Sequence, residues 1–240
     1  LRHHWRDSEL DTFASLLGAN RVISSFRHAY AAETAFGATL LLDLPRSLPG
    51  SDALDKESAL LRAWSRWIPD GWILQNAASI VRHHLQLSLP SIDEQRELIH
   101  YVPTEPNTTP SPKGFVFYTM FTRMLSPDLG RIALTAGQGK TQHDLARLAI
   151  ALEKHFLTHG SYPDALAPDL TDDPALAALH DPFDGQPYRY RRDADGGFTL
   201  WGVGQNRHDD GGTFPDANVA PGANRYDSGD LVWRIPGRSL

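Results

Sequence analysis

The chain has 240 residues, a net charge of −6 and no cysteine, so disulfides and thiolate metal sites are excluded. The charge is uneven, because residues 141–240 hold 9 Lys and Arg against 15 acids, of which 14 are Asp. An Asp-rich half disfavours nucleic acid as a partner, since phosphates need a basic face, and it favours solvated loops or a hard cation.

The sequence also bears on location. No run approaches the ~20 apolar residues of a membrane-spanning helix. The chain begins at Leu1 rather than Met, which indicates a processed or trimmed piece of a longer protein. The lack of cysteine fits a bacterial protein outside the cytoplasm. We therefore expect a periplasmic or cell-surface protein, attached to a membrane only through a segment upstream of Leu1.

Helical patterns dominate the first hundred residues. Apolar residues at helical spacing predict two helices within residues 7–42, the second ended by Pro45. Further helices are expected over residues 51–68 and 72–88. A short helix is expected over 91–100, because acidic residues in its early turns would suit the helix dipole.

A proline-rich stretch follows. Residues 102–114 contain four prolines among 13 residues, which predicts an extended linker outside any core. Helix is expected to resume over residues 115–125. This pattern divides the chain into a helical region, residues 1–101, and a second domain, residues 115–240, with its core at 141–240.

The second domain has the clearest patterns. A helix is expected over residues 142–159, with a capping box formed by Thr141 and Asp144 and a left-handed stop at Gly160. The helix has one apolar stripe, formed by Leu145, Leu148, Ala149, Leu152 and Phe156. A short helical turn is expected over residues 173–179. Three strands with alternating apolar residues are expected at 187–191, 197–203 and 231–235. The predicted fold class is α+β, with a long helix packed on a small three-stranded antiparallel sheet.

Two motifs suggest chemistry only weakly. Residues 137–141, Gly-Gln-Gly-Lys-Thr, resemble a phosphate-binding loop, but its first glycine would fall at Leu134 and no strand–helix alternation supports a nucleotide fold. His155 and His159 have the i, i+4 spacing that can clamp zinc, yet no Glu stands where a metalloprotease base would be. A structural role for both motifs is the simpler interpretation.

The acidic loop between the second and third strands is the strongest candidate site. It contains Asn206, Asp209, Asp210, Asp227, Ser228 and Asp230, with Gly residues that let the backbone curl. Calcium takes carboxylate and carbonyl oxygens, and one ion could hold so long a loop in place. The alternative is an acidic loop without a metal.

The end of the chain resembles the C-terminal domain of the major pseudopilin of type II secretion systems, within the type IV pilin-like superfamily. The resemblance covers about 95 residues. Its motifs are the helix 145–152, the Tyr162-Pro163 pair, the runs 181–190 and 197–204, and Asp230 to Trp233.

The resemblance implies an assembly module that contacts other proteins or copies of itself and carries no catalytic site. It also implies a calcium site before the last strand, with the Val203 carbonyl, Asn206, Asp227 or Ser228, and Asp230 as ligands. Asn206 replaces an aspartate of the family pattern, and the loop is longer here, so Asp209 or Asp210 could substitute. The apolar helix that begins pseudopilins is not found in this sequence.

Further resemblance extends over the whole chain. Residues 68–72 and 233–236 have counterparts in large proteins of Verrucomicrobia-type bacteria, a likeness that implies no activity. The alternative to an assembly protein is a hydrolase or a carbohydrate-active protein. Its site would lie in the helical region, lined by Trp64, Trp67, Trp72, His83 and His84.

Overall fold

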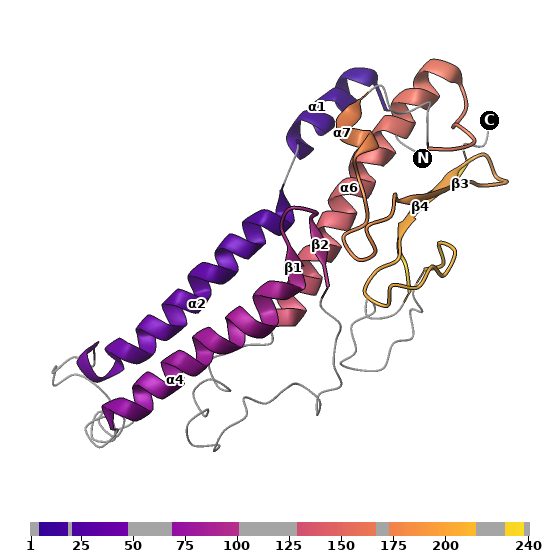
Figure 1. Cartoon of the computed structure of the whole chain (residues 1–240). Helices are drawn as coiled ribbons and strands as arrows, with labels where there is room; N and C mark the ends of the chain where they lie inside the picture. Colours follow the sequence, from indigo (N-terminus) through magenta and orange to yellow (C-terminus); the bar gives the residue numbers. More distant parts are fainter. Residues whose placement is uncertain are drawn as a thin grey trace, which may run out of the picture. The chain divides into compact units, whose positions relative to one another are not determined.

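The computed structural model describes residues 5–18, 21–47, 69–100, 129–166, 173–214 and 229–237. Over these ranges the chain is α+β, as the sequence predicted, with helices and a three-stranded antiparallel sheet (Figure 1). It divides into a C-terminal unit, made of Leu1–Ser24, Asp93–His100 and Leu134–Leu240, and a helical unit, made of Ser25–Ile92 and Tyr101–Ala133. No helix in the described ranges is long and apolar enough to cross a membrane.

In the helical unit, two helices pack side by side. They are α2 (Val22–Ser47, which enters this unit at Ser25) and α4 (Asp70–His83), which continues as the π-helical η1 (His84–Ser88). Leu41 of α2 packs against four apolar residues of α4, Trp72, Ile73, Ala77 and Ile80. The apolar periodicity therefore predicted both helices correctly, although Pro45 does not end α2 and lies within its last turn. Segments 51–68, 102–114 and 115–125 lie outside the described residues.

The sheet of the C-terminal unit follows the predicted strands closely. Its strands are β3 (Arg189–Arg192), β4 (Phe198–Gly202) and β5 (Leu231–Ile235), in the spatial order β3-β4-β5. Phe198 pairs with Ile235 and Leu200 with Trp233. Because side chains alternate along a strand, these apolar residues share one face of the sheet.

The long helix α6 (Leu129–His159) supplies the other half of this core. Strands β3 and β4 lie beside the C-terminal half of α6 in Figure 1. Four residues of the predicted helical stripe are buried in this core, and the fifth, Phe156, is partly buried against it. The buried cluster consists of Leu145, Leu148, Ala149, Leu152, Tyr162, Tyr188, Phe198 and Leu200. Gly160 ends the helix with a φ of 76°, as predicted, and a short helix α7 (Pro174–Ala177) follows.

The predicted start of α6 is wrong. The helix begins at Leu129, so Thr141 and Asp144 lie inside it and form no capping box. No proline interrupts residues 129–159, which lets the helix extend toward its N-terminus. Asp144 instead accepts hydrogen bonds from Lys140 Nζ at 2.5 Å and from the Tyr188 hydroxyl at 3.1 Å.

The predicted helix over 91–100 is also wrong. After the 3₁₀ turn η2 (Leu89–Ser91), this segment forms a hairpin of two short strands, β1 (Ile92–Asp93) and β2 (Leu98–Ile99). Asp93 Oδ1 accepts the main-chain N–H groups of Gln95 and Arg96, which favours a turn over a helix. The Ile99 N–H donates to the Pro182 carbonyl at 2.8 Å, and this bond joins β2 to the turn before β3 within the C-terminal unit.

Helix α1 (Asp7–Leu17) belongs to the same unit. Its Asp11 is paired with Lys154 of α6 at 2.5 Å. The Leu17 carbonyl, at the end of α1, accepts a hydrogen bond from His143 Nε2 at 2.6 Å. The two contacts place α1 along α6 in the opposite direction.

Two glycines of α6 differ in their surroundings, and this yields a prediction. A Cβ at Gly137 would lie 2.8 Å from side-chain atoms of Ile99 and Phe183, whereas nothing lies within 4 Å of one at Gly139. Gly139→Ala should therefore raise the free energy of unfolding by about 1 kcal/mol, the helix-propensity gain. Gly137→Ala should stabilise the protein less than Gly139→Ala or destabilise it, because Ile99 and Phe183 must move to make room for the methyl group. Urea unfolding of both variants tests this, and equal stabilisation would contradict the packing.

Candidate functional site

The acidic loop follows β4, and five of its seven predicted ligands fall within the described residues. These are Val203, Asn206, Asp209, Asp210 and Asp230. Asp227 and Ser228 lie outside the described residues. The five described residues come from two separate stretches of chain, so the question is which atoms their oxygens face.

Asp230 faces the main chain of the loop. Its two carboxylate oxygens accept the N–H of Asp210 at 3.3 Å and of Gly212 at 2.7 Å. The residue is only 1% exposed. Burial raises the pKa of Asp230, and the two N–H donors oppose that rise by favouring the charged form. Asp230 therefore ties the loop to the start of β5.

Asp209 faces the sheet. Its Oδ1 accepts the indole N–H of Trp201 at 2.8 Å and the N–H of Gly211 at 3.0 Å, and its Oδ2 lies 3.5 Å from Arg189 Nε. The Trp201 hydrogen bond is the main cause that lowers the pKa of Asp209, with smaller contributions from Gly211 and Arg189. Asp209 is therefore a charged acceptor that fastens the loop to β3 and β4.

Of the remaining predicted ligands, Asn206 and Asp210 interact with each other, and Val203 bonds elsewhere. Asp210 Oδ2 accepts from the Asn206 side-chain amide at 3.0 Å, and Oδ1 lies 3.2 Å from His208 Nδ1. The Asn206 Oδ1 accepts the His208 N–H at 3.1 Å. The Val203 N–H donates to Asp181 at 2.7 Å.

A calcium ion needs six to eight oxygens that converge on it. The oxygens of Asp209 and Asp230 instead accept N–H donors, and those of Asp210 face Asn206 and His208. Within the described ranges, no group of three or more His, Asp or Glu side chains is placed to hold a metal. Two of the seven predicted ligands, Asp227 and Ser228, lie outside the described residues, so the calcium site stays a prediction.

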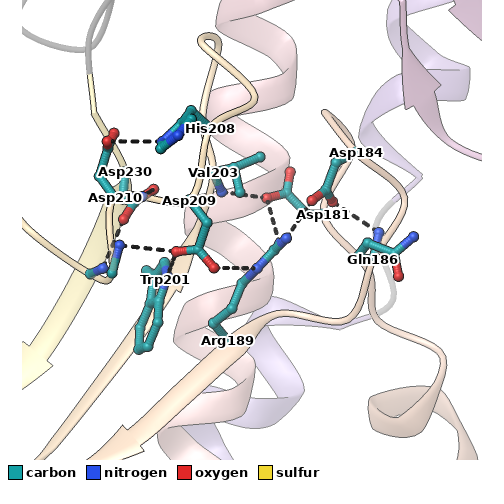
Figure 2. Close-up of polar contacts among 12 residues, drawn as sticks. Asp181, Asp184, Gln186, Arg189, Trp201, Val203, His208, Asp209, Asp210 and Asp230 are labelled. Atoms are coloured by element: carbon teal, nitrogen blue, oxygen red, sulfur yellow. Dashed lines mark hydrogen bonds and ion pairs between the residues drawn. The ribbon is translucent and has the colours of Figure 1, made fainter.

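A second carboxylate network, centred on Asp181, was not predicted from the sequence. Asp181 is fully buried and accepts the N–H of Phe183 at 2.9 Å and of Val203 at 2.7 Å. The first bond closes the Asp-Pro-Phe-Asp turn, and the second holds the end of β4. Figure 2 shows the Arg189 side chain between Asp181 and Asp209, and it also pairs with Asp184. One guanidinium therefore connects the turn with the acidic loop.

The close approach of Asp181 requires a glycine in β4. A Cβ at Gly202 would lie 2.6 Å from Asp181 Oδ2. Burial raises the pKa of Asp181 to about 6, although its two N–H donors and Arg189 favour the charged form. The sequence 181–190 predicts a turn and a strand, but nothing in it indicates that its first Asp is buried.

The Gly-Lys-Thr segment has no loop conformation that could wrap phosphate. Residues 137–141 lie inside α6, and Lys140 is only 3% exposed. Its Nζ lies 2.5 Å from Asp144 and 3.4 Å from Glu97. Lys140 therefore serves as an internal cation between two carboxylates.

The aromatic residues proposed for a cleft in the helical unit are only partly described. Trp72 is buried in the core between α2 and α4. His84 is buried, its Nδ1 lies 2.6 Å from the Thr34 hydroxyl, and burial together with nearby His83 lowers the pKa of His84 to about 4. Trp64 and Trp67 lie outside the described residues.

The C-terminal unit contains a cavity of about 530 Å³ beside the hairpin turn. Its lining mixes charges and consists of Arg21, Glu94, Gln95, Arg96, Glu97 and His180. Glu94 accepts from the Ser24 hydroxyl at 2.8 Å, and His180 Nε2 donates to the Arg96 carbonyl at 2.7 Å. Several of these polar groups are thus engaged within the protein.

Comparisons with known proteins give no assignment. No protein-family model, no curated protein and no solved structure matches the chain.

The buried Asp181 predicts an unusual pH dependence. A carboxyl whose pKa is raised on folding stabilises the protein at low pH, and this contribution disappears as the pH rises to the folded pKa of about 6. Between about pH 3 and 7, the wild type should lose about 3 kcal/mol of unfolding free energy relative to Asp181→Asn. At every pH, Asp181→Asn should also lower the unfolding free energy by about 1–3 kcal/mol. The reason is that the amide NH₂ of Asn must face the N–H of either Phe183 or Val203, which then loses its acceptor.

Urea unfolding at several pH values measures this difference. Asp164→Asn is the matched control, because that side chain is 93% exposed and should change the pH profile little. Parallel pH profiles for the wild type and Asp181→Asn would refute the assigned pKa.

Proposed function

We propose that the chain is a non-enzymatic assembly protein whose C-terminal unit, similar to a pseudopilin domain, contacts copies of itself or partner proteins outside the cytoplasm. One observation carries the proposal. The described aspartates of the turn and the acidic loop hold the chain in place: Asp181, Asp184, Asp209, Asp210 and Asp230 each interact with main-chain N–H groups or neighbouring side chains.

This use of carboxylates favours a structural role. A catalytic acid or base needs an oxygen within hydrogen-bond reach of its substrate. Asp181 and Asp230 are fully buried, and both join segments that lie far apart in the chain. A loop fixed in this way presents a constant surface, which suits repeated contacts with other subunits.

The order of elements is a second support. A long helix, a loop, two strands, an acidic loop and a last strand follow one another, and the helix packs on the sheet. This is the order on which the resemblance to pseudopilins rests. In that comparison the loop before the last strand is held by calcium, whereas the described loop residues here are held by hydrogen bonds.

The two means of holding the loop differ in a measurable way. If hydrogen bonds hold it, Asp230→Asn should lower the unfolding free energy by about 1–3 kcal/mol, because one buried N–H loses its acceptor. Asp210→Asn, the control, should change it by less than about 0.5 kcal/mol, because that side chain is 34% exposed. Calcium should not alter the melting temperature of either variant or of the wild type.

Thermal melts with EDTA and with millimolar calcium test this. A calcium-dependent rise in the wild type that Asp230→Asn abolishes would favour the calcium site with Asp227, Ser228 and Asp230, because binding to the folded state alone raises its stability.

Assembly is tested by sedimentation velocity on the full chain over a wide concentration range. We expect larger species at higher concentration and no turnover of ester, glycoside or ATP substrates. A chain that stays monomeric would contradict assembly with its own copies. Turnover that survives repurification would contradict the non-enzymatic proposal.

A further inference from the structure

The C-terminal end of α6 carries a pair of histidines on adjacent turns. The imidazole rings of His155 and His159 stack with centroids 4.1 Å apart and ring planes 19° apart. His155 is half-buried and His159 is exposed. The i, i+4 spacing therefore brings two nitrogen ligands to one accessible face of the helix.

The hydrogen bonds of the pair define its tautomers. His155 Nδ1 lies 3.1 Å from the Ser161 carbonyl, and His159 Nδ1 lies 3.1 Å from the His155 carbonyl. A carbonyl oxygen only accepts, so each Nδ1 carries the proton and donates it. Each neutral ring then has its lone pair on Nε2.

Both Nε2 atoms are available. Among the residues that the structure describes, neither Nε2 has a hydrogen-bond partner. Histidines that bind metal commonly donate their other ring N–H to a carbonyl or carboxylate, which orients the ring and makes the ligand nitrogen more basic. Each of the two rings makes this hydrogen bond in the structure. Because the rings stack almost parallel, the exposed His159 ring must turn away from the His155 carbonyl before both Nε2 atoms can reach one ion.

We propose that His155 and His159 form a binding site for a divalent transition metal ion such as zinc, nickel or copper. Each would bind through Nε2, with water completing the coordination. Imidazole nitrogen suits these metals, whereas calcium and magnesium prefer oxygen. The negative end of the α6 dipole also favours a cation here, and nearby Lys154 is paired with Asp11. This inference does not depend on the proposed assembly role.

The site has a structural consequence. Gly160 turns the chain in the left-handed region, and His155 holds the Ser161 carbonyl just beyond that turn. A metal that fixes the His155 ring would also fix this hydrogen bond. Metal binding should therefore reduce fraying of the last helical turn and of the loop that leads to Tyr162.

The test uses the full chain without an added histidine tag. Titration with zinc by calorimetry should give one strong site. His155→Gln and His159→Gln should each weaken it roughly 100-fold, because two joined ligands bind far more tightly than one. His100→Gln is the matched control, since it removes one exposed imidazole that has no histidine at i±4, and it should bind like the wild type.

A second measurement locates the metal. In NMR spectra of the histidine side chains, substoichiometric copper(II) should broaden the His155 and His159 signals before those of the other histidines. The proposal is overturned if either single variant binds zinc like the wild type, if His100→Gln is weakened equally, or if copper first broadens other rings.

Discussion

The C-terminal unit depends on one buried carboxylate. Asp181 sits where the turn before β3 meets the end of β4, and it accepts one main-chain N–H from each. Removing a carboxylate from water is costly unless donors replace the solvent. Two N–H groups and Arg189 at 3.7 Å supply that replacement, and burial still raises the pKa of Asp181. Position 202 is therefore a glycine, because a Cβ there would lie 2.6 Å from Asp181 Oδ2.

That constraint extends into the helix. The turn closed by Asp181 leads directly to Tyr188, which is buried and donates its hydroxyl proton to Asp144 of α6. Asp144 is paired with Lys140, which also faces Glu97 of the hairpin turn. A buried ion pair of this kind adds little stability by itself, but losing one partner leaves an uncompensated charge. The sheet, the helix and the hairpin are therefore held in one arrangement by polar groups as well as by apolar packing.

The sequence predicted those parts of the fold that depend on local periodicity. The stripe from Leu145 to Leu152 and the alternation in the three strands define faces that must be buried, and both are confirmed. The hairpin at 92–99 was missed because its acidic residues suit the start of a helix as well as a turn. The start of α6 was missed because Thr141 and Asp144 match a capping pattern, whereas Asp144 accepts from Lys140 of the same helix and from Tyr188.

For the candidate site as well, the sequence predicted the local pattern but not the tertiary contacts. Composition and Gly spacing identified an acidic loop, but not the atoms that its carboxylates face. Asp209 turns toward Trp201 and Asp230 toward two N–H groups, and these choices depend on the tertiary position of β4 and β5. Asp181 gave no signal at all, since an Asp before Pro is typical of an exposed turn.

The orientation of these groups decides which ligands the unit can accept. A carboxylate whose oxygens accept N–H groups must give up those bonds before it can ligate a cation, so each captured ion would cost the hydrogen bonds that hold the loop. A single histidine that donates through Nδ1 can keep that bond while its Nε2 ligates a metal, because the two bonds use different nitrogens. The stacked pair at the end of α6 must first unstack to bring both Nε2 atoms to one ion.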